Sequence, residues 1–139
     1  MKKEKHPVSG LTSVQEIQRA KAALRNLWRR TARAKHIREN RITNTDHKSK
    51  FKFTVICSVC GKRMGQSEKK FYKTKNGRRR KTGVYHVDHI HDTGMPKVTD
   101  IETDLGKFFL ELMHTKLRIV CIECHADITA KQMEKRHGR

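Results

Sequence analysis

The segment from Tyr85 to Asp92 reads Tyr-His-Val-Asp-His-Ile-His-Asp and carries three imidazoles and two carboxylates in eight residues. A neutral imidazole is a competent general base at pH 7, because its unperturbed pKa is about 6.5. A carboxylate is the ligand that hard cations such as Mg²⁺ prefer. The adjacent residues Asp88 and His89 therefore offer a metal ligand and a base, which are the two groups that hydrolysis of a phosphodiester requires.

All four cysteines lie in two Cys-x-x-Cys pairs, Cys57/Cys60 and Cys121/Cys124, on either side of this segment. In a reducing compartment such pairs indicate metal ligation rather than disulfides. Four thiolates suit a tetrahedral, structural zinc site that closes a long excursion of the chain and contributes folding free energy. His125 follows Cys124 directly, so gathering the sulfurs would also bring this imidazole toward Asp88 and His89.

The 139 residues include 33 Lys and Arg against 14 Asp and Glu, a formal charge of +19 at pH 7. This charge favours a polyanionic partner, because each cation that neutralises a phosphate releases condensed counterions. Nucleic acid is the first candidate and an anionic membrane surface the second. No apolar run approaches the roughly 20 residues of a membrane span, and the first residues lack a secretory signal. The sequence predicts a soluble, intracellular protein acting in the cytoplasm.

An N-terminal arm is predicted over residues 1–49. Ser13 with Glu16 has the spacing of a capping box, and no Pro or Gly interrupts the sequence from there to Asn40, which predicts a long helix. One side of this helix is apolar, and a cationic row lies beside it: Lys21, Arg25, Arg29 and Arg33. A solvated helix face is the plain alternative, but mutual repulsion of the four cations and the global charge favour contact with phosphates.

The remaining residues, 50–139, are predicted to form one zinc-bearing domain. A half-buried strand over 51–55 leads to the first cysteine pair, and a second strand over 116–120 leads to the other. Between them we expect a hairpin that turns at Asn76-Gly77 in type I′ geometry, with the returning strand at 78–87. A helix capped by Thr99 and Glu102 should run to His114, and a closing helix should run from His125 to about Lys135.

The hairpin is the most basic segment of the chain, with Phe71 and Tyr72 as stacking surfaces beside its cations. The predicted nucleic-acid contacts of the hairpin are Lys73, Lys75, Arg78, Arg79, Arg80 and Lys81. A flexible basic loop without a ligand is the alternative interpretation.

Val87-Asp88-His89-Ile90, followed by an alternating strand and by Cys-x-x-Cys-His at Cys121 to His125, resembles the HNH nuclease family. Members of this family have a ββα-metal fold, in which two strands and a helix surround one divalent cation. The zinc-bearing branch, which includes small phage enzymes, frames the site with two Cys-x-x-Cys pairs. The resemblance covers about Cys57 to Gln132, and it suggests a phage or mobile-element source.

The resemblance implies Asp88 and His125 as ligands of a catalytic Mg²⁺ or Mn²⁺, and His89 as the general base. It implies Cys57, Cys60, Cys121 and Cys124 as ligands of a structural zinc, and products with a 5′-phosphate and a 3′-hydroxyl. Two departures from the family pattern stand out. Lys116 occupies the place of the central Asn, with His114 nearby, and the span between Asp88 and His125 is lengthened by the helix that ends at His114.

The sequence thus predicts an α+β chain with a zinc-held ββα core and a basic helical arm, acting as an HNH endonuclease on DNA. The predicted activity is nicking or double-strand cleavage, and the sequence leaves the oligomeric state open. The rival is a non-catalytic zinc-ribbon protein that binds DNA or RNA. A third interpretation places a catalytic zinc on His86, His89 and His91, and Asp92 or His91 is a candidate for an additional metal ligand.

Overall fold

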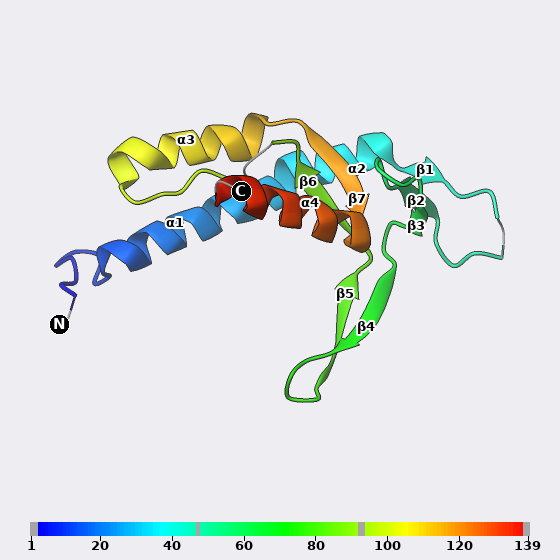
Figure 1. Ribbon diagram of the computed structural model, residues 1–139, viewed down its shortest axis with the longest axis horizontal. Helices are drawn as coiled ribbons and strands as arrows, with labels where there is room; N and C mark the ends of the chain where they lie inside the picture. Colours follow the sequence, from blue (N-terminus) through cyan, green and yellow to red (C-terminus); the bar gives the residue numbers. More distant parts are fainter. Residues whose placement is uncertain (1–2, 47, 92–93, 138–139) are drawn as a thin grey trace. The chain divides into compact units, whose positions relative to one another are not determined.

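The computed structural model describes residues 3–46, 48–91 and 94–137 (Figure 1). Its helices and small antiparallel sheets confirm the predicted α+β class. The chain forms two compact units, one of Met1–Ala34 with Gly94–Thr115 and one of Lys35–Thr93 with Lys116–Arg139. The division into an arm and a domain near residue 49 stays a prediction.

In the first unit, helix α1 (Ser13–Trp28) is capped by Thr12, one residue before the predicted cap Ser13. The Thr12 hydroxyl accepts a hydrogen bond from Gln15 N at 3.3 Å, and Gln15 Oε1 accepts one from Thr12 N at 3.0 Å. Thr12 has the extended backbone that an N-cap requires, with φ −73° and ψ 162°, whereas Ser13 is already helical. The capping box is therefore real, but the Ser13/Glu16 pair was the wrong one of two pairs with suitable spacing.

The helical conformation continues beyond α1 through a π-helical segment, Arg29–Arg33, into α2 (Ala34–Asn40), so the predicted end at Asn40 is confirmed. Within the π-helical segment the Thr31 hydroxyl donates to the carbonyl of Leu27 at 2.7 Å. Such back-bonding by a threonine competes with the regular i to i−4 ladder and is a local reason for the wider turn.

Helix α3 (Ile101–His114) is also displaced by one residue at its start and ends where predicted. Its N-cap is Asp100, whose carboxylate accepts a hydrogen bond from Glu102 N at 2.8 Å. The Thr99 hydroxyl does not cap the helix but donates to Asp104 Oδ2 at 3.0 Å. Backbone donors from Thr99 and Asp100, together with that hydroxyl, lower the pKa of Asp104 to about 2.

Helices α1 and α3 pack against each other, and Phe108 of α3 is fully buried. The Lys21 ammonium lies 5.3 Å from the Phe108 ring centroid, and the Arg25 guanidinium lies 5.6 Å from it. Two of the four cations in the predicted row, Lys21 and Arg25, therefore lie over the Phe108 ring. These two side chains have a packing role whether or not they also contact phosphates.

The second unit begins with a three-stranded antiparallel sheet of β1 (Ile42–Thr43), β2 (Phe53–Ile56) and β3 (Arg63–Gly65), with β2 in the centre. The predicted strand before the first cysteine pair is thus confirmed, shifted by about two residues. Val55 is fully buried, as the alternation predicts, but Thr54 is buried as well. The side-chain alternation predicts an exposed Thr54, and this was wrong, because both faces of β2 are covered at this position.

The basic hairpin consists of β4 (Lys69–Lys73) and β5 (Arg79–Gly83), drawn in green in Figure 1. Its turn is not type I′, because φ is positive at Gly77 (77°) but not at Asn76. Gly77 N donates to the Thr74 carbonyl and Thr74 N donates to the Arg78 carbonyl, both at 2.9 Å. These bonds describe a three-residue loop in which a type I turn is followed by a left-handed glycine.

The segment that returns from the hairpin divides at Val84, contrary to the single strand predicted. Strand β6 (Tyr85–His89) leaves β5 and pairs antiparallel with β7 (Leu117–Cys121). Helix α4 (Ile122–Arg136) follows β7 without a linker and packs on both strands. This helix begins three residues before the predicted start at His125, because the sulfur of Cys121 itself acts as the N-cap.

The burial of Phe108 leads to a stability prediction. Phe108→Ala should lower the free energy of unfolding by about 3–5 kcal/mol, because it leaves a cavity under α1. Urea denaturation followed by circular dichroism measures the change. Leu110→Ala is the matched control, since Leu110 lies on the same helix but is 53% exposed, and it should change the free energy by no more than about 0.5 kcal/mol. Equal effects of the two substitutions would rule out Phe108 as the centre of this packing.

Candidate functional site

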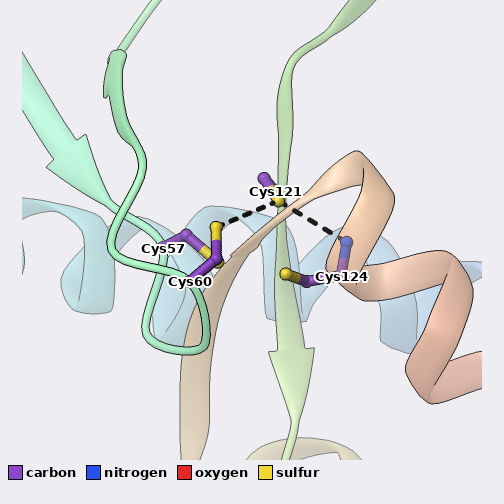
Figure 2. Close-up of side chains that lie close together, drawn as sticks. All are labelled: Cys57, Cys60, Cys121 and Cys124. Carbon is purple, nitrogen blue, oxygen red and sulfur yellow. Dashed lines mark hydrogen bonds between the residues drawn. The ribbon is translucent and has the colours of Figure 1, made fainter.

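The four cysteines converge from the loop after β2 and from the junction of β7 with α4 (Figure 2). Their sulfur atoms all lie within 4.8 Å of one another, and Cys60 Sγ lies 3.7 Å from Cys121 Sγ. A disulfide requires about 2.05 Å, so this pair is not one. Tetrahedral zinc with Zn–S bonds of about 2.3 Å places its sulfurs about 3.8 Å apart. The cluster can therefore hold a metal ion such as zinc.

Backbone hydrogen bonds fix the first cysteine pair. Gly61 N donates to the Cys57 carbonyl at 3.0 Å, and Cys57 N donates to the Lys62 carbonyl at 2.9 Å. Gly61 has φ of 78°, a conformation that glycine adopts without a steric penalty. Ser58 N donates to the carbonyl of Ile119 at 2.8 Å, which attaches this loop to β7 and hence to the second pair.

The helix start holds the second pair. Cys121 ends β7 and caps α4, with Cys124 N donating to its sulfur at 3.5 Å, as the dashed line in Figure 2 shows. A helix N-terminus carries a partial positive charge and unpaired N–H groups, so it stabilises a thiolate placed there. The end of β7, the start of α4 and the candidate metal site thus meet at Cys121.

Without a bound cation, Cys57 and Cys124 differ in how readily their thiols ionise. Burial opposes ionisation of Cys57, but backbone N–H groups of Cys60, Cys121 and Val59 prevail and lower its pKa to about 6. The neighbouring Cys121 thiol, followed by burial, raises the pKa of Cys124 to about 12. One thiolate is therefore favoured and further negative charge is penalised, which is the electrostatic condition that a bound dication relieves.

A second cluster lies on β6, β7 and the first turn of α4. His125 Nε2 lies 4.0 Å from Asp88 Oδ1, while Nε and Nη2 of Arg118 both donate to Asp88 Oδ2 at 3.3 Å. The Asp88 side chain is only 13% exposed, and those of Arg118 and His125 are 24% and 34% exposed. Each oxygen of the carboxylate thus has its own partner, and Oδ1 is the one directed at the imidazole.

His86 joins this cluster by stacking on His125, with ring centroids 4.3 Å apart and an angle of 23° between the planes. Because side chains alternate along a strand, His86 and Asp88 lie on the same face of β6, the face toward His125. Arg118 pairs with Asp88 in the register of β6 and β7, which explains its position. Sequence reasoning missed Arg118 and gave His86 a minor role, since the register that unites them cannot be read from spacing.

His89 lies on the opposite face of β6 from Asp88, by the same alternation, and only 8% of its surface is exposed. Its ring meets His91 edge-on, with centroids 5.9 Å apart. The strand ends at His89, and Ile90 N donates to the carbonyl of Lys116 at 2.8 Å just beyond. The structure thus brings Asp88 and His125 together and leaves His89 beside them on the other face.

The other candidate ligands have different surroundings. The His91 backbone carbonyl accepts a hydrogen bond from Gln132 Nε2 of α4 at 2.9 Å, while its ring Nδ1 is buried with no hydrogen-bond partner among the described residues. Asp92 lies outside the described residues. The predicted nucleic-acid contacts of the hairpin are exposed along β4, β5 and their loop: Lys73, Lys75, Arg78, Arg79, Arg80 and Lys81.

Comparison with known proteins found no matching family model, no matching curated protein and no matching solved structure. None of the helices in the described part of the chain is long and apolar enough to cross a membrane. The case for a function therefore depends on the geometry of the two clusters and on the charge of the chain.

The cysteine geometry predicts that the fold depends on a bound metal. Cys60→Ser should leave the purified protein with less than one zinc per chain and lower its thermal unfolding midpoint, because a coordinating thiolate is lost. Metal analysis by mass spectrometry and a thermal scan by circular dichroism measure both effects. Ser58→Ala, in the same loop but without a ligand atom, is the matched control. A Cys60→Ser protein with full zinc and an unchanged midpoint would show that the cluster is not a metal site.

Proposed function

We propose that the chain is a divalent-metal-dependent endonuclease of the HNH type, which hydrolyses phosphodiester bonds of DNA. One observation carries the proposal: the Asp88 carboxylate and the His125 imidazole, 37 positions apart in sequence, meet at 4.0 Å on two antiparallel strands followed by a helix. Cys124, the last of the four clustered cysteines, directly precedes His125 in the chain. This is the combination of residues that the resemblance to HNH nucleases leads one to expect.

The structural metal in this proposal is zinc, bound by all four cysteines. The tetrahedral sulfur spacing supports zinc over harder cations, which prefer oxygen ligands. Its role is to fix α4 against β7, so that His125 is presented to Asp88.

The Asp88 and His125 pair suits a second, catalytic cation. Two ligands with bonds of about 2.1 Å to one ion lie at most about 4.2 Å apart, so a separation of 4.0 Å allows both to bind it. Mg²⁺ or Mn²⁺ held there would offset charge on the phosphate and on the leaving oxygen. Arg118 occupies only Oδ2 of Asp88, so it orients the carboxylate and leaves Oδ1 for the cation.

The base in this proposal is His89. In an in-line displacement the attacking water and the leaving oxygen lie on opposite sides of phosphorus. Asp88 and His89 lie on opposite faces of β6 at its end, so a phosphate at that end would have the cation on one side and the imidazole on the other. The burial of His89 favours His86 as the alternative general base, because His86 is exposed and lies on the same face of β6 as Asp88.

DNA as the substrate is supported by the charge of +19 and by the exposed cations of the hairpin. These cations and the row Lys21, Arg25, Arg29 and Arg33 would set affinity and its salt dependence rather than the chemical step. The products implied by the resemblance are a 5′-phosphate and a 3′-hydroxyl.

A zinc-ribbon protein that binds DNA or RNA without catalysis is the second candidate. It is favoured by the ion pair between Arg118 and Asp88, because the guanidinium neutralises the carboxylate and no metal ion is needed for that. In that case Asp88, Arg118 and His125 would form a structural polar cluster. A binding protein does not require an acid and an imidazole to converge beside a tetracysteine cluster, whereas a metal-dependent nuclease does, so the nuclease is the better-supported proposal.

Cleavage of supercoiled plasmid with Mg²⁺ or Mn²⁺ tests this function. The wild type should convert the plasmid to nicked or linear DNA, and His89→Ala should lower the rate by about 100-fold or more, because general-base catalysis contributes about 10²–10⁴-fold. His137→Ala, at the exposed end of α4, is the control and should cut normally.

His86→Ala distinguishes the two candidate bases. It should retain far more activity than His89→Ala if His89 is the base, and the reverse order would assign the proton transfer to His86. Zinc content is measured for every variant, to confirm that each is folded. If no protein cuts while all bind DNA with equal affinity, the binding protein is the correct assignment.

A further inference from the structure

One face of the basic hairpin carries an aromatic ring among cations. The register of β4 and β5 sets Phe71 opposite Lys81 and Lys73 opposite Arg79, so these four side chains lie on the same face. The Arg79 guanidinium lies 3.7 Å from the Phe71 ring centroid and the Lys81 ammonium 5.1 Å from it. The Phe71 residue is nevertheless 51% exposed.

This face continues into a groove of about 560 Å³ at the base of the hairpin. Its volume falls within the range of about 300–1,000 Å³ that is usual for small-molecule sites. Two rings, three ammonium groups and one carboxylate line it: Phe51, Phe71, Lys50, Lys69, Lys81 and Glu68. Arg79 is not among the lining residues, so its guanidinium does not fill the groove.

The second ring, Phe51, packs closely on the neighbouring backbone. Phe51 packs on the backbone of Gly65, where a Cβ atom would lie only 2.5 Å from Phe51 Cγ. The Lys50 ammonium lies 5.4 Å from the centroid of the Phe51 ring. Glu68 is fixed as well, because its Oε1 accepts a hydrogen bond from Gly65 N at 3.1 Å. The groove thus lies between the segment that precedes β2 and the base of the β4–β5 hairpin, and packing and a backbone hydrogen bond position Phe51 and Glu68 in it.

We propose that this groove binds an unpaired nucleotide of the DNA. The base would stack on Phe71, and its phosphate would lie among Lys50, Lys69 and Lys81. This inference rests on the proposed function and deepens it, because it names DNA with a single-stranded or unpaired segment as the preferred substrate class.

The chemistry of the face favours an unpaired nucleotide over a duplex. Cations alone suffice to contact the backbone of a duplex, whose base faces are hidden by their neighbours in the stack. An exposed ring flanked by cations matches the sites at which single-stranded nucleic acids stack a base and neutralise its phosphate. The carboxylate of Glu68 adds an acceptor for an N–H donor on the edge of a base, such as N3–H of thymine, and it would repel a second phosphate.

The test compares binding to single-stranded oligodeoxythymidylate and to a fully paired duplex of the same nucleotide count. Fluorescence anisotropy is measured with zinc-loaded protein and without Mg²⁺ or Mn²⁺, so no cleavage occurs. Phe71→Ala should weaken single-strand binding by about 5- to 100-fold, because stacking on one base is lost. Its affinity for the duplex should stay within about twofold, since phosphate contacts remain.

Tyr72→Ala is the matched control, because the sequence offers Tyr72 as a second stacking surface but the structure puts this exposed ring on the other face of β4, outside the groove. It should change neither affinity by more than about twofold. Phe71→Leu keeps apolar volume without a ring, and it should reproduce the selective loss even if the alanine variant folds poorly. A 2-aminopurine in the single strand should be quenched by the wild type and much less by Phe71→Leu.

A wild type that does not bind the single strand would overturn the proposal. So would equal losses on the single strand and the duplex, or losses from Phe71→Ala no greater than those from Tyr72→Ala. Since no catalytic cation is present, these outcomes are independent of plasmid cleavage. If the protein cuts plasmid but Phe71→Ala causes no selective loss of single-strand binding, the nuclease proposal stands and the nucleotide groove is rejected.

Discussion

The convergence of four thiols at the start of α4 is the constraint on which the candidate site depends. Cys60 and Cys121 are 61 positions apart in sequence, yet their sulfurs lie 3.7 Å from each other. The hydrogen bond from Ser58 N to Ile119 holds the first loop on β7, and Cys121 is at once the end of that strand, the cap of α4 and a candidate metal ligand. A cation bound there would offset the mutual repulsion of the thiolates and so stabilise the whole junction.

Two local features then bring the residues of the candidate site together beside this cysteine cluster. His125 lies one residue after Cys124 in the first turn of α4, so its position is tied to the sulfur cluster. The register of β6 and β7 sets Arg118 against Asp88, and side-chain alternation adds His86 to the same face. The acid is thereby held between a guanidinium and an imidazole, with one oxygen directed at each.

Much of this could be predicted from the sequence, because helices, strand alternation and paired cysteines are local patterns. The helix ends at Asn40 and His114, the strands before each cysteine pair and the meeting of Asp88 with His125 followed from such patterns. The caps at Thr12 and Asp100 did not, because neighbouring residues offered equal spacing and backbone conformation decided between them. The role of Arg118 and the burial of His89 depend on strand register, which spacing alone does not encode.

The most direct test of the account is the binding of Mn²⁺ to zinc-loaded protein, followed by electron paramagnetic resonance of free Mn²⁺. We expect the wild type to bind one Mn²⁺ in addition to its zinc, and Asp88→Asn and His125→Ala to lose the Mn²⁺ while retaining one zinc per chain. Asp127→Asn, an exposed acid on the same helix as His125, should bind Mn²⁺ like the wild type. Mn²⁺ binding that survives both substitutions, or a zinc-loaded wild type that binds none, would contradict the account.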